Sequence, residues 1–122
     1  MIKKVLILDD DPLIQTTLEQ ALRLEDIQTQ VAGEGKLGLN LVNSWQPDLI
    51  LLDHHMPGMT GIEFLRQIRS DKQYEDIEVI YLTSDADITH VNEALSLGVK
   101  TYLNKSEVQI GDIVKVIKTT LA

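Results

Sequence analysis

Short apolar runs recur along the chain, and each is bounded by polar residues. The three strongest runs cover residues 5–8, 49–52 and 79–82. Continuous apolar runs of this length are typical of strands that are buried on both faces of a parallel sheet. Two weaker runs, at residues 27–31 and 99–103, follow the same rhythm, and the first alternates as an edge strand does. The pattern therefore predicts five strands.

Between these runs lie stretches whose apolar residues recur with helical spacing. The spacing predicts helices around residues 13–21, 37–42, 62–68, 91–97 and 110–121. Pro12 suits the first turn of the first helix, Pro47 must end the second, and Gly98 closes the fourth as a C-terminal cap. Ser106 and Glu107 are expected to open the last helix.

Strands that alternate with helices in this way indicate an α/β fold. Right-handed crossovers then make the sheet parallel, with helices on both of its faces. The length of 122 residues predicts a single domain that spans residues 1–122. Ligands of such sheets bind beyond the carboxyl ends of the strands, so the residues at those ends are the candidates for chemistry.

Carboxylates, a hydroxyl and a lysine follow the predicted strands. The segments are Asp9-Asp10-Asp11, Asp53-His54-His55, Thr83-Ser84-Asp85 and Asn104-Lys105. Carboxylates on one rim repel one another unless a cation neutralises them, and oxygen ligands suit Mg²⁺. A carboxylate beside Mg²⁺ is able to attack phosphorus and give an aspartyl phosphate. A lysine and a hydroxyl placed nearby would meet the phosphoryl oxygens.

Composition excludes several other classes of function. Lys and Arg number 11 against 19 Asp and Glu, and the net charge of −8 argues against a surface for nucleic acid or anionic membranes. The chain has no cysteine, which excludes disulfides and cysteine-ligated metals. No apolar run approaches the ~20 residues of a membrane span, and the apolar stretch within residues 1–5 is too short for a signal peptide. We therefore expect a cytoplasmic protein without direct nucleic-acid or membrane contacts.

Five motifs, in order and spacing, resemble the receiver domain of two-component response regulators of the chemotaxis-regulator type. They are Ile-Leu-Asp-Asp-Asp at residues 7–11, Asp-Leu-Ile-Leu-Leu-Asp at 48–53, Met-Pro-Gly-Met-Thr-Gly at 56–61, Leu-Thr-Ser at 82–84 and Gly-Val-Lys-Thr-Tyr-Leu-Asn-Lys at 98–105. The resemblance covers essentially the whole chain. It implies a flavodoxin-like (βα)5 fold with strand order 2-1-3-4-5.

The resemblance also implies the roles of the acidic residues. Asp53 would accept a phosphoryl group from a histidine kinase or a histidine phosphotransfer protein. Asp10 and Asp53 would ligate Mg²⁺ directly, Asp9 would help through water, and the backbone carbonyl of His55 would be a further ligand. Mn²⁺ would be able to replace Mg²⁺. The domain would phosphorylate and dephosphorylate itself rather than act as a metabolic enzyme.

Three more residues take roles through the same resemblance. Lys105 would pair with the Asp53 carboxylate and then with the phosphoryl group. Thr83 would bond a phosphoryl oxygen, and the ring orientation of Tyr102 would follow Thr83. The resulting switch would be read by an unknown downstream protein or output domain, on the face of the fourth helix, fifth strand and fifth helix.

Two features go beyond the family pattern. The family usually has a cis-linked proline after the lysine, whereas Ser106 follows Lys105 here. A cis bond before a residue other than proline costs about 2.5–4 kcal/mol, so we predict a trans bond. His55 and Asp85 occupy positions that flank the path of the hydrolytic water, and we expect them to tune the lifetime of the phosphoryl group.

Four candidate residues have simpler interpretations. Asp11, just before Pro12, is expected to be a helix cap. His54 and His55 are adjacent at a strand end and are expected to point in opposite directions, which argues against one metal bound by both imidazoles. His90 lies in a predicted helix and is expected to face solvent.

Three other functions are weighed against the receiver hypothesis. A magnesium phosphatase with an aspartyl nucleophile would need a second aspartate two residues after Asp53, where His55 stands. A flavodoxin-type FMN carrier would need Ser, Thr and Gly where Asp9, Asp10 and Asp11 repel phosphate, and it would be coloured. A pseudo-receiver, or another interaction module that is not phosphorylated, should have lost a key group, and none is missing.

Overall fold

Five parallel strands form the centre of the molecule in the order β2-β1-β3-β4-β5. The computed structural model describes residues 2–84 and 88–122. The strands are β1 (Lys4–Leu8), β2 (Gln28–Ala32), β3 (Leu49–Leu52), β4 (Glu78–Thr83) and β5 (Thr101–Asn104). The predicted fold class and strand order are confirmed, with each boundary within two residues of its predicted run.

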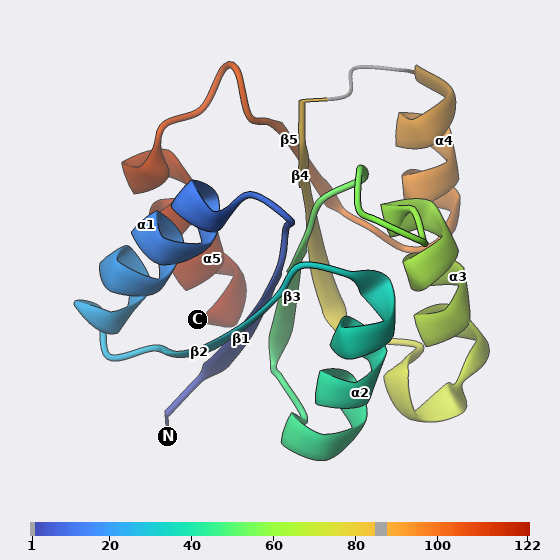
Figure 1. Cartoon of the computed structure of the whole chain (residues 1–122), viewed down its shortest axis with the longest axis horizontal. Helices are drawn as coiled ribbons and strands as arrows, with labels where there is room; N and C mark the ends of the chain where they lie inside the picture. Colours follow the sequence, from blue (N-terminus) through green and yellow to red (C-terminus); the bar gives the residue numbers. More distant parts are fainter. Residues whose placement is uncertain (1, 85–87) are drawn as a thin grey trace.

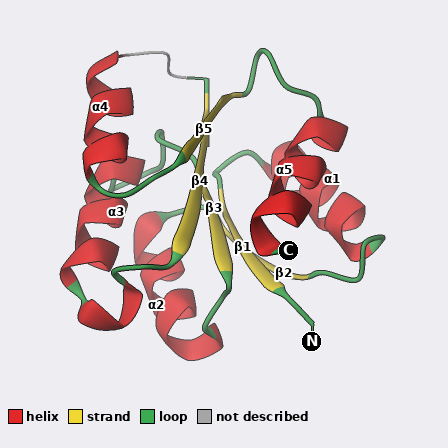
Figure 2. Cartoon of the chain, turned by 180° about the vertical axis from the view of Figure 1, so that it is seen from behind, coloured by secondary structure: helices red, strands yellow, loops and turns green. Residues whose placement is uncertain are grey.

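Helices cover both faces of the sheet (Figures 1 and 2). On one face lie α1 (Pro12–Arg23) and α5 (Ile110–Leu121), and on the other lie α2 (Gly35–Trp45), α3 (Gly61–Ser70) and α4 (Ile88–Ser96). A single 3₁₀ turn, η1 (Lys72–Tyr74), leads from α3 to β4. None of the helices in residues 2–84 and 88–122 is long and apolar enough to cross a membrane.

Alternation along the central strands builds two core layers. Leu6 and Leu8 of β1 pack with the α2, α3 and α4 side, whereas Val5 and Ile7 pack with α1 and α5. All four are fully buried, and burial of such a side chain contributes roughly 1.5–3 kcal/mol. The edge strand β2 instead alternates exposed and part-buried residues, as predicted. The interior strands β1 and β3 are thereby buried on both faces up to their carboxyl ends.

The helix boundaries follow local hydrogen bonds. Asp11 is the N-cap of α1, with its side chain accepting the Leu13 N–H at 2.9 Å, and this confirms the predicted cap. Gly98, with φ of +84°, follows α4 in the left-handed conformation that glycine favours. The second helix ends at Trp45, before Pro47, as predicted.

The predicted start of the last helix at Ser106 and Glu107 is wrong. The N–H and hydroxyl of Ser106 both donate backward to Asn104 Oδ1, at 2.9 and 2.7 Å, which keeps this segment in a turn. The helix begins at Ile110, where Asp112 accepts the Gln109 N–H at 3.0 Å. The peptide bond between Lys105 and Ser106 is trans, as predicted.

Candidate functional site

Two adjacent strands bring three aspartates together. Asp9 and Asp10 follow β1, and Asp53 follows β3. The Asp53 N–H donates to the Leu8 carbonyl at 2.9 Å, which continues the ladder one residue past the strand and sets Asp53 beside Asp9. Asp9 and Asp53 are buried, whereas Asp10 is exposed. Carboxylate oxygens of Asp9, Asp10 and Asp53 lie within 4.8 Å of one another, and we call these residues the acidic cluster.

Lys105 carries the positive charge that faces this cluster. Its N–H donates to the Thr83 carbonyl at 3.0 Å, which extends β5 beside the end of β4. Its Nζ lies 2.5 Å from Asp9 Oδ2 and 3.3 Å from Asp53 Oδ2. The predicted pairing with Asp53 is therefore present, but the shorter ion pair is made with Asp9.

Burial and charge act on the acid–base properties of this pair in opposite ways. Burial raises the pKa of the Asp9 carboxyl above its ordinary value, although hydrogen bonds from Lys105 and the Asp11 N–H oppose the rise. Burial alone would lower the pKa of Lys105, but hydrogen bonding and attraction to Asp9 and Asp53 raise it. Lys105 therefore stays charged at neutral pH. One ammonium facing three carboxylates leaves an excess of negative charge.

Two hydrogen bonds hold the side chain and the carbonyl of Asp9, and one of them comes from a residue that the sequence did not single out. The Asp11 N–H donates to Asp9 Oδ1 at 3.0 Å. The side-chain amide of Gln15, on α1, donates to the Asp9 carbonyl at 2.5 Å. Both contacts orient the loop between β1 and α1. The sequence could not identify this role of Gln15, because a single glutamine in a helix belongs to no recognisable motif.

Thr83 and Tyr102 lie on neighbouring strands near the cluster. Thr83 ends β4 and is fully buried, and Tyr102 lies on β5, opposite Tyr81 of β4. The rings of Tyr81 and Tyr102 stack, with centroids 5.2 Å apart and planes 8° apart. Tyr81 was not predicted as a site residue, since an apolar strand with one tyrosine is ordinary core.

The rings of the three histidines gather around His54, contrary to two predictions. His54 is buried, and its ring lies 4.9 Å from that of His55 in an edge-to-face arrangement, so the two rings do not point apart. The strand ends at Leu52, and beyond it the alternation of side-chain directions no longer holds. His90 does not simply face solvent: it is half-buried and stacks on His54, with centroids 3.8 Å apart. Asp85 lies outside the described residues.

Residues 5–118 match the family model of the response regulator receiver domain. The chain belongs to this family. The receiver domain is 36% identical over 105 residues to sporulation initiation phosphotransferase F of Bacillus subtilis. This alignment covers 86% of this chain and 83% of that protein. A CheY-like receiver domain protein from Methanospirillum hungatei superposes on it with a TM-score of 0.91 at 27% identity, over 99% of this chain and 94% of that one.

A longer relative shares the same region. The receiver domain is 36% identical over 105 residues to the DNA-binding response regulator MtrA of Mycolicibacterium smegmatis. The alignment covers 86% of this chain but only 45% of MtrA, so the chain spans about half the length of that relative. Receiver domains of this family work in two-component systems, where they accept phosphoryl groups from histidine kinases or phosphotransfer proteins.

The acidic cluster of the receiver domain fits a hard divalent cation. All three of its side chains offer carboxylate oxygens, the ligands that Mg²⁺ prefers, and their spacing allows one ion to reach all three. The histidines are not part of this group, although their rings lie close together. The negative excess left by Lys105 also favours a cation.

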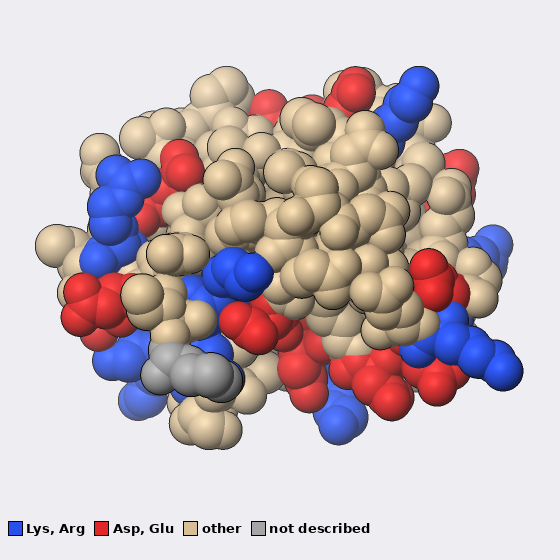
Figure 3. Space-filling model, turned by 90° about the horizontal axis from the view of Figure 1, so that it is seen from below, with Lys and Arg blue, Asp and Glu red and all other residues tan. Residues whose placement is uncertain are grey.

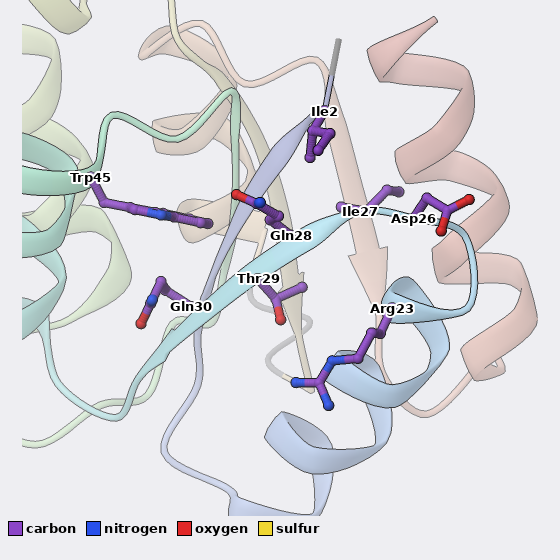
Figure 4. Close-up of a pocket in the computed structure, with 8 residues that line it drawn as sticks. All are labelled: Ile2, Arg23, Asp26, Ile27, Gln28, Thr29, Gln30 and Trp45. Carbon is purple, nitrogen blue, oxygen red and sulfur yellow. The ribbon is translucent and has the colours of Figure 1, made fainter.

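A hollow of the receiver domain lies away from this site. It measures about 600 Å³ and sits at the amino end of the sheet, between the ends of α1 and α2 and the edge strand β2 (Figure 4). Its lining includes Arg23, Gln28 and Trp45, and none of the predicted site residues. On the face in Figure 3, acidic and basic side chains are interspersed rather than gathered into a basic surface.

Proposed function

We propose that this receiver domain takes a phosphoryl group onto Asp53 from the phosphohistidine of a kinase or phosphotransfer protein. An Asp53 oxygen bonds to phosphorus while the phosphorus–nitrogen bond breaks, and the histidine leaves and recovers a proton. The observation that carries the proposal is the buried Asp53 carboxylate, which has Asp9 and Asp10 on one side and the Lys105 ammonium on another. Such a transfer depends on position and charge more than on covalent help.

The neighbouring residues have distinct roles in this proposal. Asp10 and Asp53 would hold Mg²⁺, or Mn²⁺ in its place, with Asp9 acting through water and His55 through its backbone carbonyl. When bound, the ion would neutralise charge between the carboxylates and the incoming phosphoryl group. Lys105 would move from Asp9 and Asp53 onto a phosphoryl oxygen, which is a short change of partner for a flexible side chain.

The output of the proposed switch involves β4, β5 and the helices beside them. Thr83, buried at the end of β4, would donate its hydroxyl to the phosphoryl group, and Tyr102 would follow with a change of ring orientation. The face formed by α4, β5 and α5 would then bind a downstream protein. The identity of that partner and the cytoplasmic location stay predictions.

Two residues are proposed to control how long the phosphoryl group persists. His55 is exposed directly beyond the buried Asp53–His54 pair, a position from which its side chain can act on an approaching water. Asp85 is proposed for the same role from its place in the sequence, two residues after Thr83. A pseudo-receiver is disfavoured, because the acidic cluster, Thr83 and Lys105 are all present.

Intact-mass measurement after incubation with acetyl phosphate tests the proposal. The wild-type protein should gain one base-labile phosphoryl group when Mg²⁺ is present, with acetate as the leaving group, and none when Mg²⁺ is chelated. Asp53→Asn should gain none. Asp48→Asn removes the same charge at the other end of β3 and should behave as wild type.

The decay of the label tests the lifetime residue in the same experiment. After removal of acetyl phosphate, His55→Ala should lose the phosphoryl group at a different rate from wild type while gaining it equally fast. Modification of Asp53→Asn to the wild-type extent would overturn the assignment of the acceptor. An unchanged decay in His55→Ala would remove His55 from the proposal.

A further inference from the structure

His54 contacts three different parts of the receiver domain. Its main-chain N–H donates to Asp53 Oδ1 at 2.8 Å. Its Nδ1 shares a hydrogen bond of 2.6 Å with the Tyr81 hydroxyl of β4. Its ring stacks on that of His90 in α4, with centroids 3.8 Å apart and planes 28° apart. A residue that is only 4% exposed thus joins the proposed acceptor to β4 and to α4.

His54 is closely packed against Gly61 at the start of α3. The Gly61 N–H donates to the His54 carbonyl at 2.8 Å. A Cβ at Gly61 would lie 2.5 Å from the Tyr81 hydroxyl oxygen and 3.0 Å from the His54 Cα. Atoms packed this closely transmit a displacement rather than absorb it. A shift of His54 is therefore passed toward His90, which is half-buried on a helix at the surface.

Ala94 of α4 is buried in the core, and three further contacts are spaced along the described part of this helix. His90 stacks on His54 near its start, Glu93 pairs with Arg66 at 2.6 Å near its middle, and the Leu97 carbonyl just after it accepts from Arg69 Nε at 2.7 Å. Arg69 also donates to two main-chain carbonyls before β4, so this end is firmly anchored. The end of α4 nearer Asp53 is the one that rests on an aromatic stack.

We propose that the stack of His54 on His90 couples the state of Asp53 to the position of α4, alongside the route through Thr83 and Tyr102. Phosphorylation replaces the single negative charge of the Asp53 carboxylate with a phosphoryl group that carries about −1.5 to −2, and it changes what Oδ1 accepts from the His54 N–H. The His54 ring then shifts against His90, and α4 moves about its anchored end. The inference rests on the proposed function, because it takes Asp53 as the acceptor.

Coupling of this kind is reciprocal, and this gives it a quantitative test. Beryllium fluoride with Mg²⁺ serves as the probe, as a stable mimic of the phosphoryl group on an aspartate. Hydrogen exchange of amides 92–96 reports on α4, and calorimetry gives the affinity for beryllium fluoride. In the wild type we expect the probe to change these exchange rates by about fivefold or more, the lower range of allosteric coupling.

Variants of His90 separate the stack from other contacts of α4. In His90→Gln, which keeps a polar side chain but has no ring, the probe should change the exchange rates by less than about twofold. The affinity for beryllium fluoride should change by the same factor as the probe-dependent change in exchange that the variant loses, since coupling is mutual. His90→Phe restores an aromatic ring and should restore the wild-type response. Arg66→Gln breaks the contact with Glu93 and should alter exchange equally with and without the probe, at unchanged affinity.

The outcomes distinguish this inference from the function on which it rests. A full probe-dependent change in His90→Gln, or failure of His90→Phe to restore it, overturns the coupling and leaves the acceptor role of Asp53 intact. Wild-type protein that binds the probe no better than Asp53→Asn overturns the proposed function and the coupling with it.

Discussion

Lys105 forms ion pairs with two carboxylates through one ammonium group. Its Nζ contacts both Asp9 and Asp53, and its side chain is 19% exposed. In the absence of a cation, this contact offsets much of the cost of burying two acids side by side. A metal ion or a phosphoryl group must therefore draw Lys105 away from a partner that it already has, which makes this residue responsive to whatever occupies the site.

Lys105→Met tests this balance at the scale of a single residue. Without Mg²⁺ the variant should lose about 3 kcal/mol of unfolding free energy, because two buried carboxylates lose their partner. Mg²⁺ should restore stability more than in wild type, since no ammonium competes with it. Phosphorylation by acetyl phosphate should slow by about 100-fold, as expected for loss of a group that stabilises transition-state charge.

Urea unfolding with and without Mg²⁺, together with intact-mass kinetics, measures these effects. Lys118→Met is the matched control, because it breaks the exposed pair of Lys118 with Glu25 at 2.9 Å. Exposed pairs contribute at most about 1 kcal/mol, so the control should lose little and should phosphorylate normally. Equal losses in the two variants would contradict the account of the buried pair.

At the scale of elements, the first turn of α3 determines how closely the loop after β3 packs. A Cβ at Gly61 would lie 2.4 Å from the Asp53 carbonyl oxygen and 2.5 Å from the Tyr81 hydroxyl. The first contact is with main chain, which cannot move aside as the end of a flexible side chain can. Glycine at this position is therefore a requirement of packing between α3 and the site.

Gly61→Ala should lower the free energy of unfolding by about 3 kcal/mol or more, because the added methyl overpacks the loop. Gly111→Ala makes the same chemical change in α5, where an added Cβ meets nothing within 4 Å. That control should instead gain up to about 1 kcal/mol, the advantage of alanine over glycine in a helix. Urea denaturation curves compare the two, and coinciding midpoints would contradict the packing argument.

At the scale of the whole molecule, the acidic cluster links metal binding to folding. Asp9 and Asp10 come from one strand end and Asp53 from another, 43 positions on in the chain. Only the folded state brings their oxygens within 4.8 Å, so a bound cation stabilises that state alone. The net charge of −8 also attracts cations in general. A control with Na⁺ at the same ionic strength measures this general effect.

Mg²⁺ at 100 times its dissociation constant should raise the free energy of unfolding by about 2.7 kcal/mol. Asp10→Asn should remove most of this gain, because an exposed cluster carboxylate is lost. Asp11→Asn makes the same change one residue along and keeps a side chain that caps α1, so its gain should match wild type. Thermal unfolding at constant ionic strength measures all three. A full gain in Asp10→Asn would exclude Asp10 as a ligand.

The sequence by itself determined the elements and the rim on which the chemistry lies. Buried parallel strands are continuous apolar runs, and the residue after each run must lie at the carboxyl edge of the sheet. Asp9, Asp53, Thr83 and Lys105 were therefore predictable as neighbours. The start of α5 was not predictable in this way. The N–H and hydroxyl of Ser106 both donate to Asn104 Oδ1, and these hydrogen bonds hold Ser106 in a turn before the helix.

Tertiary structure alone decided which partners the side chains take. The preference of Lys105 for Asp9 depends on distances of 2.5 and 3.3 Å, and no spacing in the chain encodes a difference so small. His54 lies in the loop after β3 and His90 lies in α4, and nothing in the sequence of one segment indicates contact with the other. Periodicity reports which face of an element is buried, whereas contact between elements depends on how their faces meet in space.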